Sequence, residues 1–144
     1  MVVIGLALYQ VMTTKPPPDQ EQIARQIENA RSAAENRSVN GIFHAISANY
    51  IDSEGHNVDQ LHFILTRALR DSGQLTIALS PPNTNVAGDT ATSLIHAHIV
   101  SQQNKAAFDT DVTLHWRRED GTRFLILPAK TWRVVGADYN SPDE

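Results

Sequence analysis

The sequence has 144 residues, of which 41% are hydrophobic and 19% charged, a composition that suits a single globular domain and excludes a disordered chain. The formal net charge of −4 argues against binding to nucleic acid or to an anionic membrane surface. Cysteine is absent, which excludes disulfide bonds, a thiol nucleophile and cysteine-bound zinc.

Residues 1–18 differ in composition from the rest of the chain. Residues 2–12 are uncharged and mostly apolar, and Pro16, Pro17 and Pro18 follow them. Because a helix that spans a bilayer needs about 20 apolar residues, we expect the remnant of a membrane anchor whose first half precedes this chain, with the prolines as a stiff spacer. An anchor predicts a periplasmic or extracellular domain that meets the membrane only through this segment. The alternatives are a terminal strand or helix that docks on the domain, and a cytoplasmic location.

Two helices are predicted before residue 50. The first begins at Asp19, which we expect to cap the helix together with Gln22, and it ends near Asn36. Its apolar residues recur at helical spacing, and its other face is charged. The second helix begins at Ser38 and continues to about Asn49, where the chain turns towards the third helix.

The third predicted helix spans residues 57–72. Asn57 and Gln60 have the spacing of a capping box, and Gly73 has the position of a helix-terminating glycine. The apolar stripe of this helix is the clearest in the chain and consists of Val58, Leu61, Ile64, Leu65, Ala68 and Leu69. His62 lies at the edge of the stripe, where a partly buried, hydrogen-bonded histidine is the favoured interpretation and a catalytic residue is the alternative.

Alternating apolar and polar residues predict four strands after the helices, at residues 75–86, 90–101, 106–118 and 122–135. Pro81 and Pro82 interrupt the first strand, which favours a bent edge strand. Asp120 and Gly121 are the strongest hairpin signal, so we expect the last two strands to be joined there. Pro128 is expected at a bulge in the last strand.

A four-residue turn at residues 102–105 determines how the two middle strands pair. The inner face then carries the pairs Ile99–Phe108, Ala97–Thr110, Ile95–Val112 and Ser93–Leu114. The outer face carries the pairs His98–Asp109 and His96–Asp111. A shift by one residue would mix polar and apolar side chains on both faces, so this register is the expected one.

Three helices followed by a long, bent antiparallel sheet resemble the nuclear transport factor 2-like superfamily, which includes SnoaL-like and ketosteroid-isomerase-like domains. The resemblance covers residues 19–139 and depends on the ISANYID segment after the second helix, the GDTAT start of the second strand, and the closing DGTRFLI and TWRVVGAD segments. It implies an α+β, cystatin-like fold in which three N-terminal helices pack in the concave face of a strongly bent four-stranded antiparallel sheet. Such a cone has a pocket at its open end, and residues 140–144 form a polar tail. The fold itself does not determine the function.

The resemblance does not extend to the catalytic residues of the steroid isomerases. Those enzymes use an aspartate base after the second helix, a tyrosine on the first helix and a second acid on the sheet. Here the predicted first helix has no tyrosine, and Asp109 and Asp111 lie on the outer face. Asp52 and Glu54 lie near the position of the base without a secure match, so the isomerase chemistry is not carried over.

Tyr50 and Asp52 form the main candidate site. A carboxylate half-buried beside aromatic rings can act as a base, but an aspartate that binds backbone amides of the following turn is the favoured interpretation. Trp116 and Trp132 could line a pocket or fill the core. The predicted pocket residues are Phe43, Tyr50, Asp52, His62, Trp116 and Trp132, and only Asp52 and His62 are catalytic candidates.

His96 and His98 are the only residues with the spacing of metal ligands. Alternate residues of a strand share a face about 7 Å apart, and Asp109 or Asp111 could complete a zinc or copper site. Histidines paired with these aspartates on an exposed or dimer-buried face are the favoured interpretation. We therefore expect no metal and no cofactor.

These observations favour a non-catalytic module that binds a small ligand or supports assembly, tethered to a membrane outside the cytoplasm. A small apolar ligand could occupy the pocket, and no nucleic acid partner is expected. The alternative is a SnoaL-like isomerase or hydrolase with an acid/base residue at the mouth of the cone. Leu94, Phe124 and Ile126 share the outer face with the histidines, so we also expect a homodimer through that face.

Overall fold

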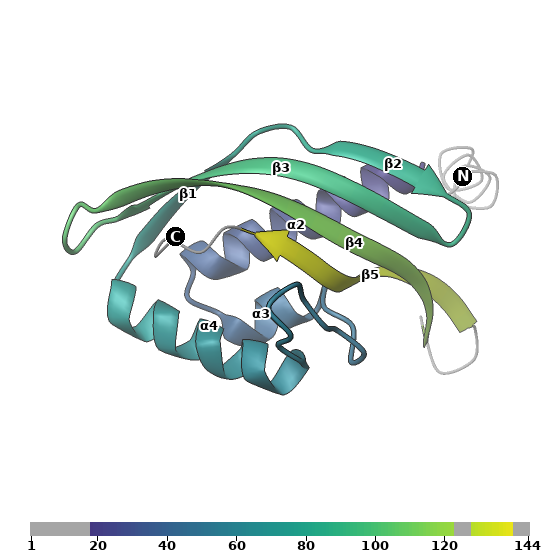
Figure 1. Cartoon of the computed structure of the whole chain (residues 1–144), viewed down its shortest axis with the longest axis horizontal. Coiled ribbons are helices and arrows are strands. Elements are labelled where there is room, and N and C mark those ends of the chain that lie inside the picture. The colour runs from purple at the N-terminus through teal and green to yellow at the C-terminus, as the bar shows by residue number, and fades with distance from the viewer. Residues whose placement is uncertain (1–17, 123–127, 140–144) are drawn as a thin grey trace, which may run out of the picture.

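The computed structural model describes residues 18–122 and 128–139 of the chain (Figure 1). The helices are α2 (Asp19–Glu35), α3 (Val39–Phe43) and α4 (Val58–Ser72). The strands are β1 (Leu75–Leu79), β2 (Asn83–Ala87), β3 (Thr90–Ser101), β4 (Ala107–Thr122) and β5 (Pro128–Tyr139). No helix within the described ranges is long and apolar enough to cross a membrane. The expected anchor at residues 2–12 and the polar tail at 140–144 lie outside those ranges.

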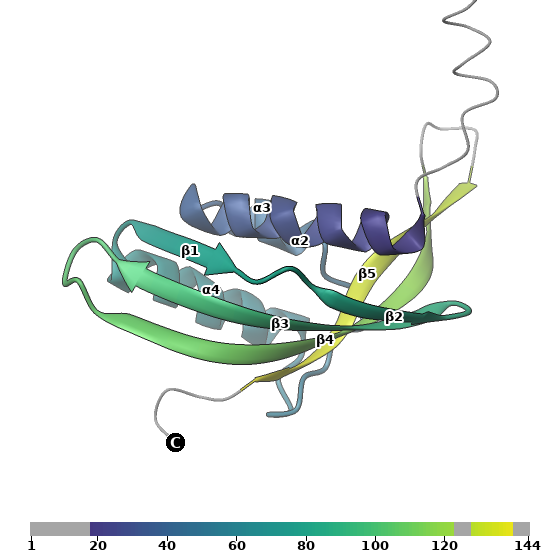
Figure 2. The same cartoon turned by 90° about the horizontal axis from the view of Figure 1, so that it is seen from above.

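The strands form one antiparallel sheet in the order β1-β3-β4-β5, and β2 also pairs with β3. The sheet curls over α2 and α4, so the helices occupy its concave side (Figure 1, Figure 2). The expected α+β fold, with three helices and a strongly bent sheet, is therefore confirmed. The described sheet has five strands rather than four, because Pro81 and Pro82 lack amide hydrogens and divide the first edge strand into β1 and β2.

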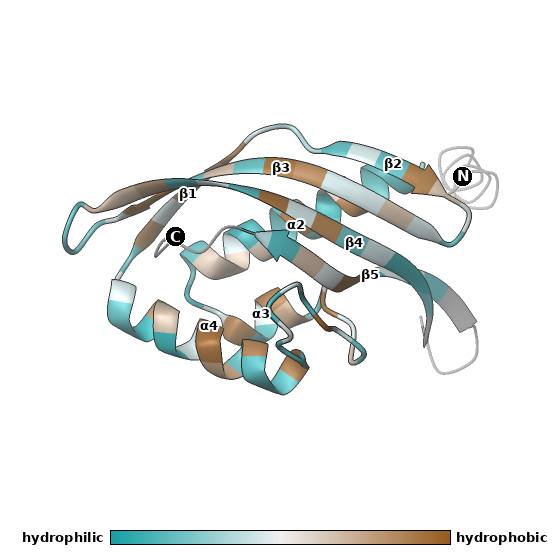
Figure 3. Cartoon of the chain, in the orientation of Figure 1, coloured by the Kyte–Doolittle hydropathy of each residue, from teal (hydrophilic) through white to brown (hydrophobic). Residues whose placement is uncertain are grey.

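The predicted register of β3 and β4 is confirmed. Ile95 pairs with Val112 on the inner face, and His96 pairs with Asp111 on the outer face. Exposed and buried residues alternate along β3 from Thr90 to His98. Figure 3 shows the corresponding alternation of hydrophobic and hydrophilic residues along the middle strands. The concave face is therefore apolar, and the convex face is polar.

The core lies between α2 and the concave face of the sheet. α2 buries Ile23 and Ile27, which are one helical turn apart and so project from the same side. They pack with Trp116, Trp132 and Val134 of β4 and β5. Both tryptophans are almost fully buried, so their rings fill the centre of this core.

The second helix is shorter than predicted. α3 does not continue to Asn49, because the residues that follow it pair with the edge of β5. The Val134 amide donates to the Ala45 carbonyl over 2.7 Å, and the Ser47 amide donates to the Val134 carbonyl over 2.9 Å. The segment 45–53 therefore lies along β5, and its backbone groups form hydrogen bonds with the sheet instead of within a helix.

Asp19 does not act as the predicted helix cap. It is the first residue of α2, and Pro18 occupies the N-cap position without a side-chain hydrogen bond. The Asp19 carboxylate instead accepts hydrogen bonds from Arg118 and Trp132. This carboxylate therefore joins the start of α2 to the sheet.

The other predicted helix ends are confirmed. The Ser38 hydroxyl accepts a hydrogen bond from the Gly41 amide at the start of α3 over 3.1 Å. Asn57 and Gln60 form both hydrogen bonds of a capping box at the start of α4, each over 2.9 Å. Gly73 follows α4 with a positive φ of 65°, a conformation that favours glycine.

The strands β4 and β5 extend past the predicted hairpin. Asp120 pairs with Lys130 and Gly121 pairs with Ala129, so the two residues predicted as the turn belong to a strand. The connection falls at residues 123–127, outside the described ranges. Pro128 is the first residue of β5 and is not at a bulge. A proline is tolerated at this position because the first residue of a strand need not donate a ladder hydrogen bond.

Candidate ligand-binding cavity

A cavity of about 480 Å³ lies between the helices and the concave face of the sheet. This volume is within the range of about 300–1,000 Å³ that is typical of small-molecule sites. The helices and the segment after α3 contribute Gln26, Ile27, Ala30, Arg31, Ile42, Ala45, Ile46, Tyr50, Leu61, Ile64 and Leu65. The sheet contributes Ile77, Leu79, Ile95, Ala97, Ile99, Phe108, Thr110, Val112, Leu114, Trp116, Val134, Ala137 and Tyr139. Most of the lining is therefore apolar.

Arg31 is the charged residue of this lining, and its guanidinium is already paired. Its Nε donates to Glu28 over 2.9 Å, and its Nη1 lies 2.8 Å from Glu35. The hydrogen bonds to these two carboxylates raise the pKa of Arg31 further above its ordinary value. Protein carboxylates thus neutralise this cation at the wall of the cavity.

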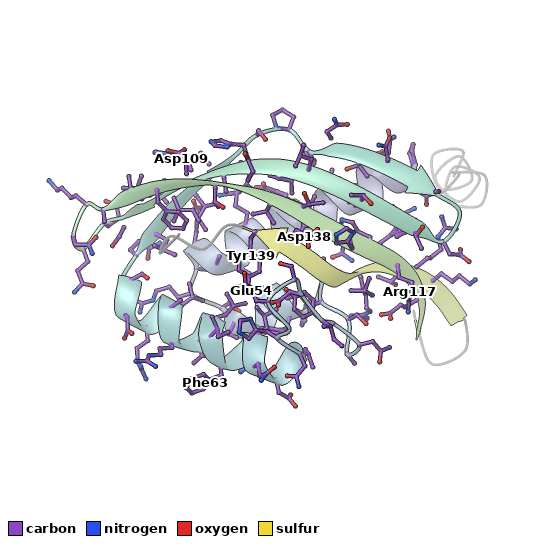
Figure 4. The ribbon with its side chains drawn as sticks, viewed as in Figure 1. Glu54, Phe63, Asp109, Arg117, Asp138 and Tyr139 are labelled. Carbon is purple, nitrogen blue, oxygen red and sulfur yellow. The ribbon has the colours of Figure 1, made fainter. Side chains whose placement is uncertain are left out.

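Tyr50 and Tyr139 meet at the carboxylate of Asp52 on one side of the cavity. The Tyr50 hydroxyl donates to Asp52 Oδ2 over 3.0 Å, and the Tyr139 hydroxyl donates to the same oxygen over 3.2 Å. Asp52 Oδ1 accepts from the amides of Glu54 and His56, each over 3.0 Å. Figure 4 shows Tyr139 near the end of β5, beside the loop that carries Glu54. The Asp52 side chain is fully buried, and both of its oxygens are hydrogen-bonded.

The turn after Asp52 explains how the carboxylate reaches these amides. Gly55 has a positive φ of 82°, which a residue with a side chain adopts only at a cost. The Gly55 amide donates to the Asp52 carbonyl, and the chain then returns so that the His56 amide points at the carboxylate. An aspartate that binds the amides of its own turn is a common device for stabilising such loops.

The electrostatics of this cluster keep Asp52 ionised. Burial by itself would raise the pKa of Asp52, but the hydrogen bonds from the His56 amide, the two tyrosines and the Glu54 amide hold it below its ordinary value. Burial and the nearby Asp52 carboxylate raise the pKa of Tyr50, and they raise the pKa of Tyr139 to about 12. A carboxylate with a lowered pKa is a weak base, so these shifts disfavour a catalytic base at Asp52.

Some of the predicted pocket residues line the cavity, and others lie outside the lining. Tyr50 and Trp116 line the cavity. Asp52 is held by the lining tyrosines but is not itself one of the lining residues. Trp132 is also not part of the lining, because its ring is buried in the core and its Nε1 donates to Asp19 over 3.2 Å.

Phe43 and His62, which were predicted as pocket residues, are not among the residues that line the cavity. Their rings contact each other with centroids 5.0 Å apart. α4 directs Leu61 and Leu65 into the cavity, and His62, one position along the helix, is exposed to solvent. This exposed position gives no support to a catalytic role for His62.

Tyr139 belongs to the candidate site but was not predicted from the sequence. In β5, Val135 is an extra residue between Val134 and Gly136, whose partners on β4 are adjacent residues. Strict alternation from Val134 would place Tyr139 on the outer face, but the bulge reverses the alternation and places it on the cavity side. The isolated Gly136 was the available signal, because a glycine inside a strand often marks a bulge. A Cβ at this position would lie 2.8 Å from the Ile51 carbonyl oxygen.

The outer face of the sheet carries the predicted histidine–aspartate pairs. His96 Nδ1 lies 2.8 Å from Asp111 and its Nε2 lies 3.1 Å from Asp109, while His98 Nδ1 lies 2.8 Å from Asp109. The hydrogen bonds to Asp111 and Asp109 raise the pKa of His96, and those from His98 and His96 lower the pKa of Asp109. No cluster suited to a metal ion occurs among the residues of the described ranges.

Leu94 is the apolar residue expected on this outer face, and 51% of its surface is exposed. Phe124 and Ile126, which were expected beside it, lie outside the described ranges. His115 shares the face and lies 2.8 Å from Asp138. The convex surface therefore combines an exposed leucine with paired histidines.

Comparisons with known proteins define the fold. No known family model matches the sequence, and no curated protein is significantly similar to it. An NTF2-like protein of unknown function from Pseudomonas putida KT2440 matches with a TM-score of 0.69 at 16% identity, over 85% of this chain and 86% of that chain. A protein of the NTF2-like family from Streptomyces avermitilis, provisionally named a dehydratase, matches with a TM-score of 0.69 at 14% identity, over 87% of this chain and 96% of that chain.

Bd1075 from Bdellovibrio bacteriovorus is a longer protein of similar structure. It matches with a TM-score of 0.68 at 12% identity over 83% of this chain, and this chain covers 40% of its length. Identities at this level establish the fold alone. The comparisons therefore confirm the NTF2-like, cystatin-like fold that the sequence resembled.

Proposed function

We propose that this domain binds a small, mostly apolar molecule in its cavity and does not transform it chemically. The observation that carries the proposal is the composition of the lining: it is mostly apolar and includes no aspartate, glutamate or histidine among the described residues. Burial of apolar surface supplies the driving force for binding. General acid–base catalysis, by contrast, needs a group with a pKa near the working pH within hydrogen-bond reach of the ligand. The titratable residues of the described lining are Tyr50, Tyr139 and Arg31, and the pKa of each is raised above its ordinary value.

The role of Asp52 in this proposal is to hold the loop and the two tyrosines. Its side chain is fully buried and accepts four hydrogen bonds from Tyr50, Tyr139 and two amides. These contacts stabilise the wall of the cavity on the side where the segment 45–53 covers β5. A well-ordered wall reduces the entropy that a ligand has to overcome on binding.

The alternative function is that of a SnoaL-like isomerase or hydrolase. Two observations favour it: a protein provisionally named a dehydratase has the same fold, and the Asp52 carboxylate is bonded directly to two lining residues. In that mechanism Asp52 would act on the ligand through Tyr50 or Tyr139. The high pKa of both tyrosines and the low pKa of Asp52 oppose such a proton transfer.

The proposal includes attachment to a membrane outside the cytoplasm through residues 2–12. The support is the uncharged, mostly apolar sequence of this segment and the three prolines that separate it from α2. Apolar molecules concentrate in bilayers, so a domain tethered to the membrane would lie near a high local concentration of its ligands. Association of two copies through the outer face of the sheet is a further part of the proposal, supported by the exposure of Leu94.

Binding of N-phenyl-1-naphthylamine, a neutral fluorescent probe of apolar sites, tests the proposed function. We expect saturable binding with a stoichiometry of one probe per chain. The variant Ala97→Trp places an indole in the cavity, because Ala97 is a small lining residue in the middle of β3. We expect it to weaken binding by about tenfold or more.

Ala78→Trp is the matched control for this experiment. Ala78 pairs with His98 and is exposed on the outer face, so the same substitution leaves the cavity unchanged. Its affinity for the probe should equal that of the wild-type chain. Absence of saturable binding to the wild-type chain, or equal effects of the two substitutions, would contradict the proposed function.

A further inference from the structure

We propose that the cavity selects apolar molecules that carry a hydrogen-bond donor, such as a hydroxyl group, and discriminates against carboxylates with the same carbon skeleton. This inference rests on the proposed function, since it names the class of ligand that the same cavity would take. It follows from the protons and charges of the polar groups that surround the apolar lining.

The first step concerns the protons of the two tyrosines. A phenol has one proton to donate, and the hydroxyls of Tyr50 and Tyr139 both lie within donating distance of Asp52 Oδ2. The Tyr139 oxygen also lies 3.4 Å from His56 Nδ1, so the Tyr50 oxygen is the less engaged of the two. The other carboxylate oxygen of Asp52 is occupied by two backbone amides. On this side of the cavity the phenol oxygens therefore offer lone pairs and no free proton. A ligand hydroxyl can donate to such an oxygen, whereas a carbonyl, ether or carboxylate oxygen finds no donor there.

The second step concerns the remaining hydrogen-bond donors of the wall. The Trp116 indole lines the cavity, but its Nε1 donates to Ser93 over 3.1 Å. Gln26 donates through its Nε2 to the Trp132 carbonyl over 3.1 Å. The Gln26 amide has a second proton and an oxygen beside this bond, and Thr110 is the lining residue with a hydroxyl outside the tyrosine cluster. Gln26 and Thr110 are therefore the lining residues that compete with the tyrosines as partners for a polar ligand group.

The third step concerns charge. Asp52 is an ionised carboxylate one side chain behind the lining, and its hydrogen bonds favour the charged form. The Arg31 guanidinium is bound by Glu28 and Glu35, so the described lining has no cation available for an anionic ligand. A carboxylate that entered the cavity would lose its hydration without gaining a counter-ion, which is unfavourable. A neutral alcohol loses less hydration free energy on entering the cavity, and it gains a hydrogen bond to a phenol oxygen.

Competition between ligands of one chain length tests this inference. 1-Decanol, decyl methyl ether and decanoate displace N-phenyl-1-naphthylamine from the wild-type chain at about pH 7.5, and each inhibition constant is measured. We expect decanol to bind about three- to tenfold more tightly than the ether, the size of one neutral hydrogen bond. We expect decanoate to bind at least about tenfold more weakly than decanol.

Three variants locate the hydrogen bond. Tyr50→Phe and Tyr139→Phe each remove one phenol oxygen, and their combination should abolish the preference for decanol over the ether while the ether still binds. Thr110→Val removes the competing hydroxyl and should leave the preference intact. If the tyrosine variants are too unstable to measure, the inference is still tested by the affinities of the three ligands for the wild-type chain and for Thr110→Val.

The outcomes separate this inference from the proposed function. Equal or tighter binding of decanoate, equal binding of decanol and the ether, or failure of all three to displace a bound probe would overturn the inference and leave the proposed function standing. Loss of the preference in Thr110→Val would also overturn it. Failure of the probe itself to bind the wild-type chain would overturn the proposed function and the inference together.

Discussion

The guanidinium of Arg118 lies over the ring of Trp132, with its central carbon 4.8 Å from the ring centre. Both side chains donate to one carboxylate: Arg118 to Asp19 over 2.8 Å and the Trp132 indole to Asp19 over 3.2 Å. These bonds connect the first turn of α2 to residues 99 and 113 positions later in the chain. The cluster therefore attaches α2 to β4 and β5.

Asp19→Asn should destabilise the fold by about 1–3 kcal/mol, because the amide cannot replace the charged acceptor for both Arg118 and the buried indole. Urea unfolding followed by tryptophan fluorescence measures the change. Asp59→Asn is the matched control, since Asp59 is an exposed aspartate in the first turn of α4. A similar loss of stability in both variants would show that the effect comes from the helix dipole and not from the cluster.

Asp52→Asn should destabilise the fold by about 2–4 kcal/mol at neutral pH, because a buried amide cannot accept from two phenols and two backbone amides at once. The pH dependence has a definite sign. The folded-state pKa of Asp52 is below its ordinary value of 3.8, so its contribution to stability is present above that value and is lost as the pH falls through the folded pKa. The difference between wild type and Asp52→Asn should thus stay constant from about pH 8 to pH 5. A difference that shrinks between pH 7 and pH 5 would indicate a raised pKa and favour the enzyme alternative.

His96→Gln should lower the melting temperature more at about pH 5.5 than at about pH 8.5. The pKa of His96 is raised above its ordinary value of 6.5 by Asp111 and Asp109. Its contribution is therefore fully present below that value and is lost as the pH rises through the folded pKa. His62→Gln serves as the control, since no carboxylate among the described residues forms an ion pair with this exposed histidine. Equal effects of His96→Gln at the two pH values would refute the pairing.

Leu94→Glu should convert a homodimer into a monomer, because it adds a charge to the outer face at the most exposed apolar residue described there. Sedimentation velocity between about pH 5 and pH 8 measures the association. The dissociation constant should vary with pH because His96, whose pKa is raised by Asp111 and Asp109, lies on the same face. Phe63→Glu is the control: Phe63 is 66% exposed, and Figure 4 shows it below α4, on the opposite side of the molecule from Asp109. A wild-type chain that is monomeric at every concentration and pH would remove the dimer from the proposal.

Deletion of residues 1–12 should release the protein from membranes and leave the stability of the domain within about 0.5 kcal/mol of that of the full chain. The deletion retains Pro18, whose carbonyl accepts the Gln22 amide in the first turn of α2 over 3.0 Å. Membrane fractionation and urea unfolding of both chains measure the two effects. Unfolding of the shortened domain would favour the alternative in which this segment packs against the core.

Features that depend on local alternation were predictable from the sequence. The register of β3 and β4 follows from the alternation of residues such as Ile95 and His96 and from the length of one turn, because a one-residue shift would expose the apolar set. The capping box of Asn57 and Gln60 is equally local. These elements position the concave face and α4, and they account for much of the cavity wall.

Features that depend on partners distant in the sequence were not predictable in this way. Asp120 and Gly121 have a strong turn preference, but pairing with Lys130 and Ala129 continues the ladder and outweighs it. The end of α3 depends on the edge of β5, which the residues of α3 do not reveal. The cavity position of Tyr139 depends on a bulge, and a single extra residue reverses the side of every residue that follows.

Both edges of the described sheet have backbone groups that are hydrogen-bonded by other parts of the chain. The segment 45–53 covers part of β5. At the other edge, side chains of α2 bind the backbone of β1 and β2: Glu35 accepts from the Ile77 amide over 2.8 Å, and Gln20 donates to the Thr84 carbonyl over 3.2 Å. An edge whose polar groups are occupied is a poor template for an added strand, and the proline pair between β1 and β2 blocks it further. Because these edge groups are occupied, strand addition at these positions is disfavoured when many copies of the domain are crowded together, and the risk of fibril growth through them is reduced.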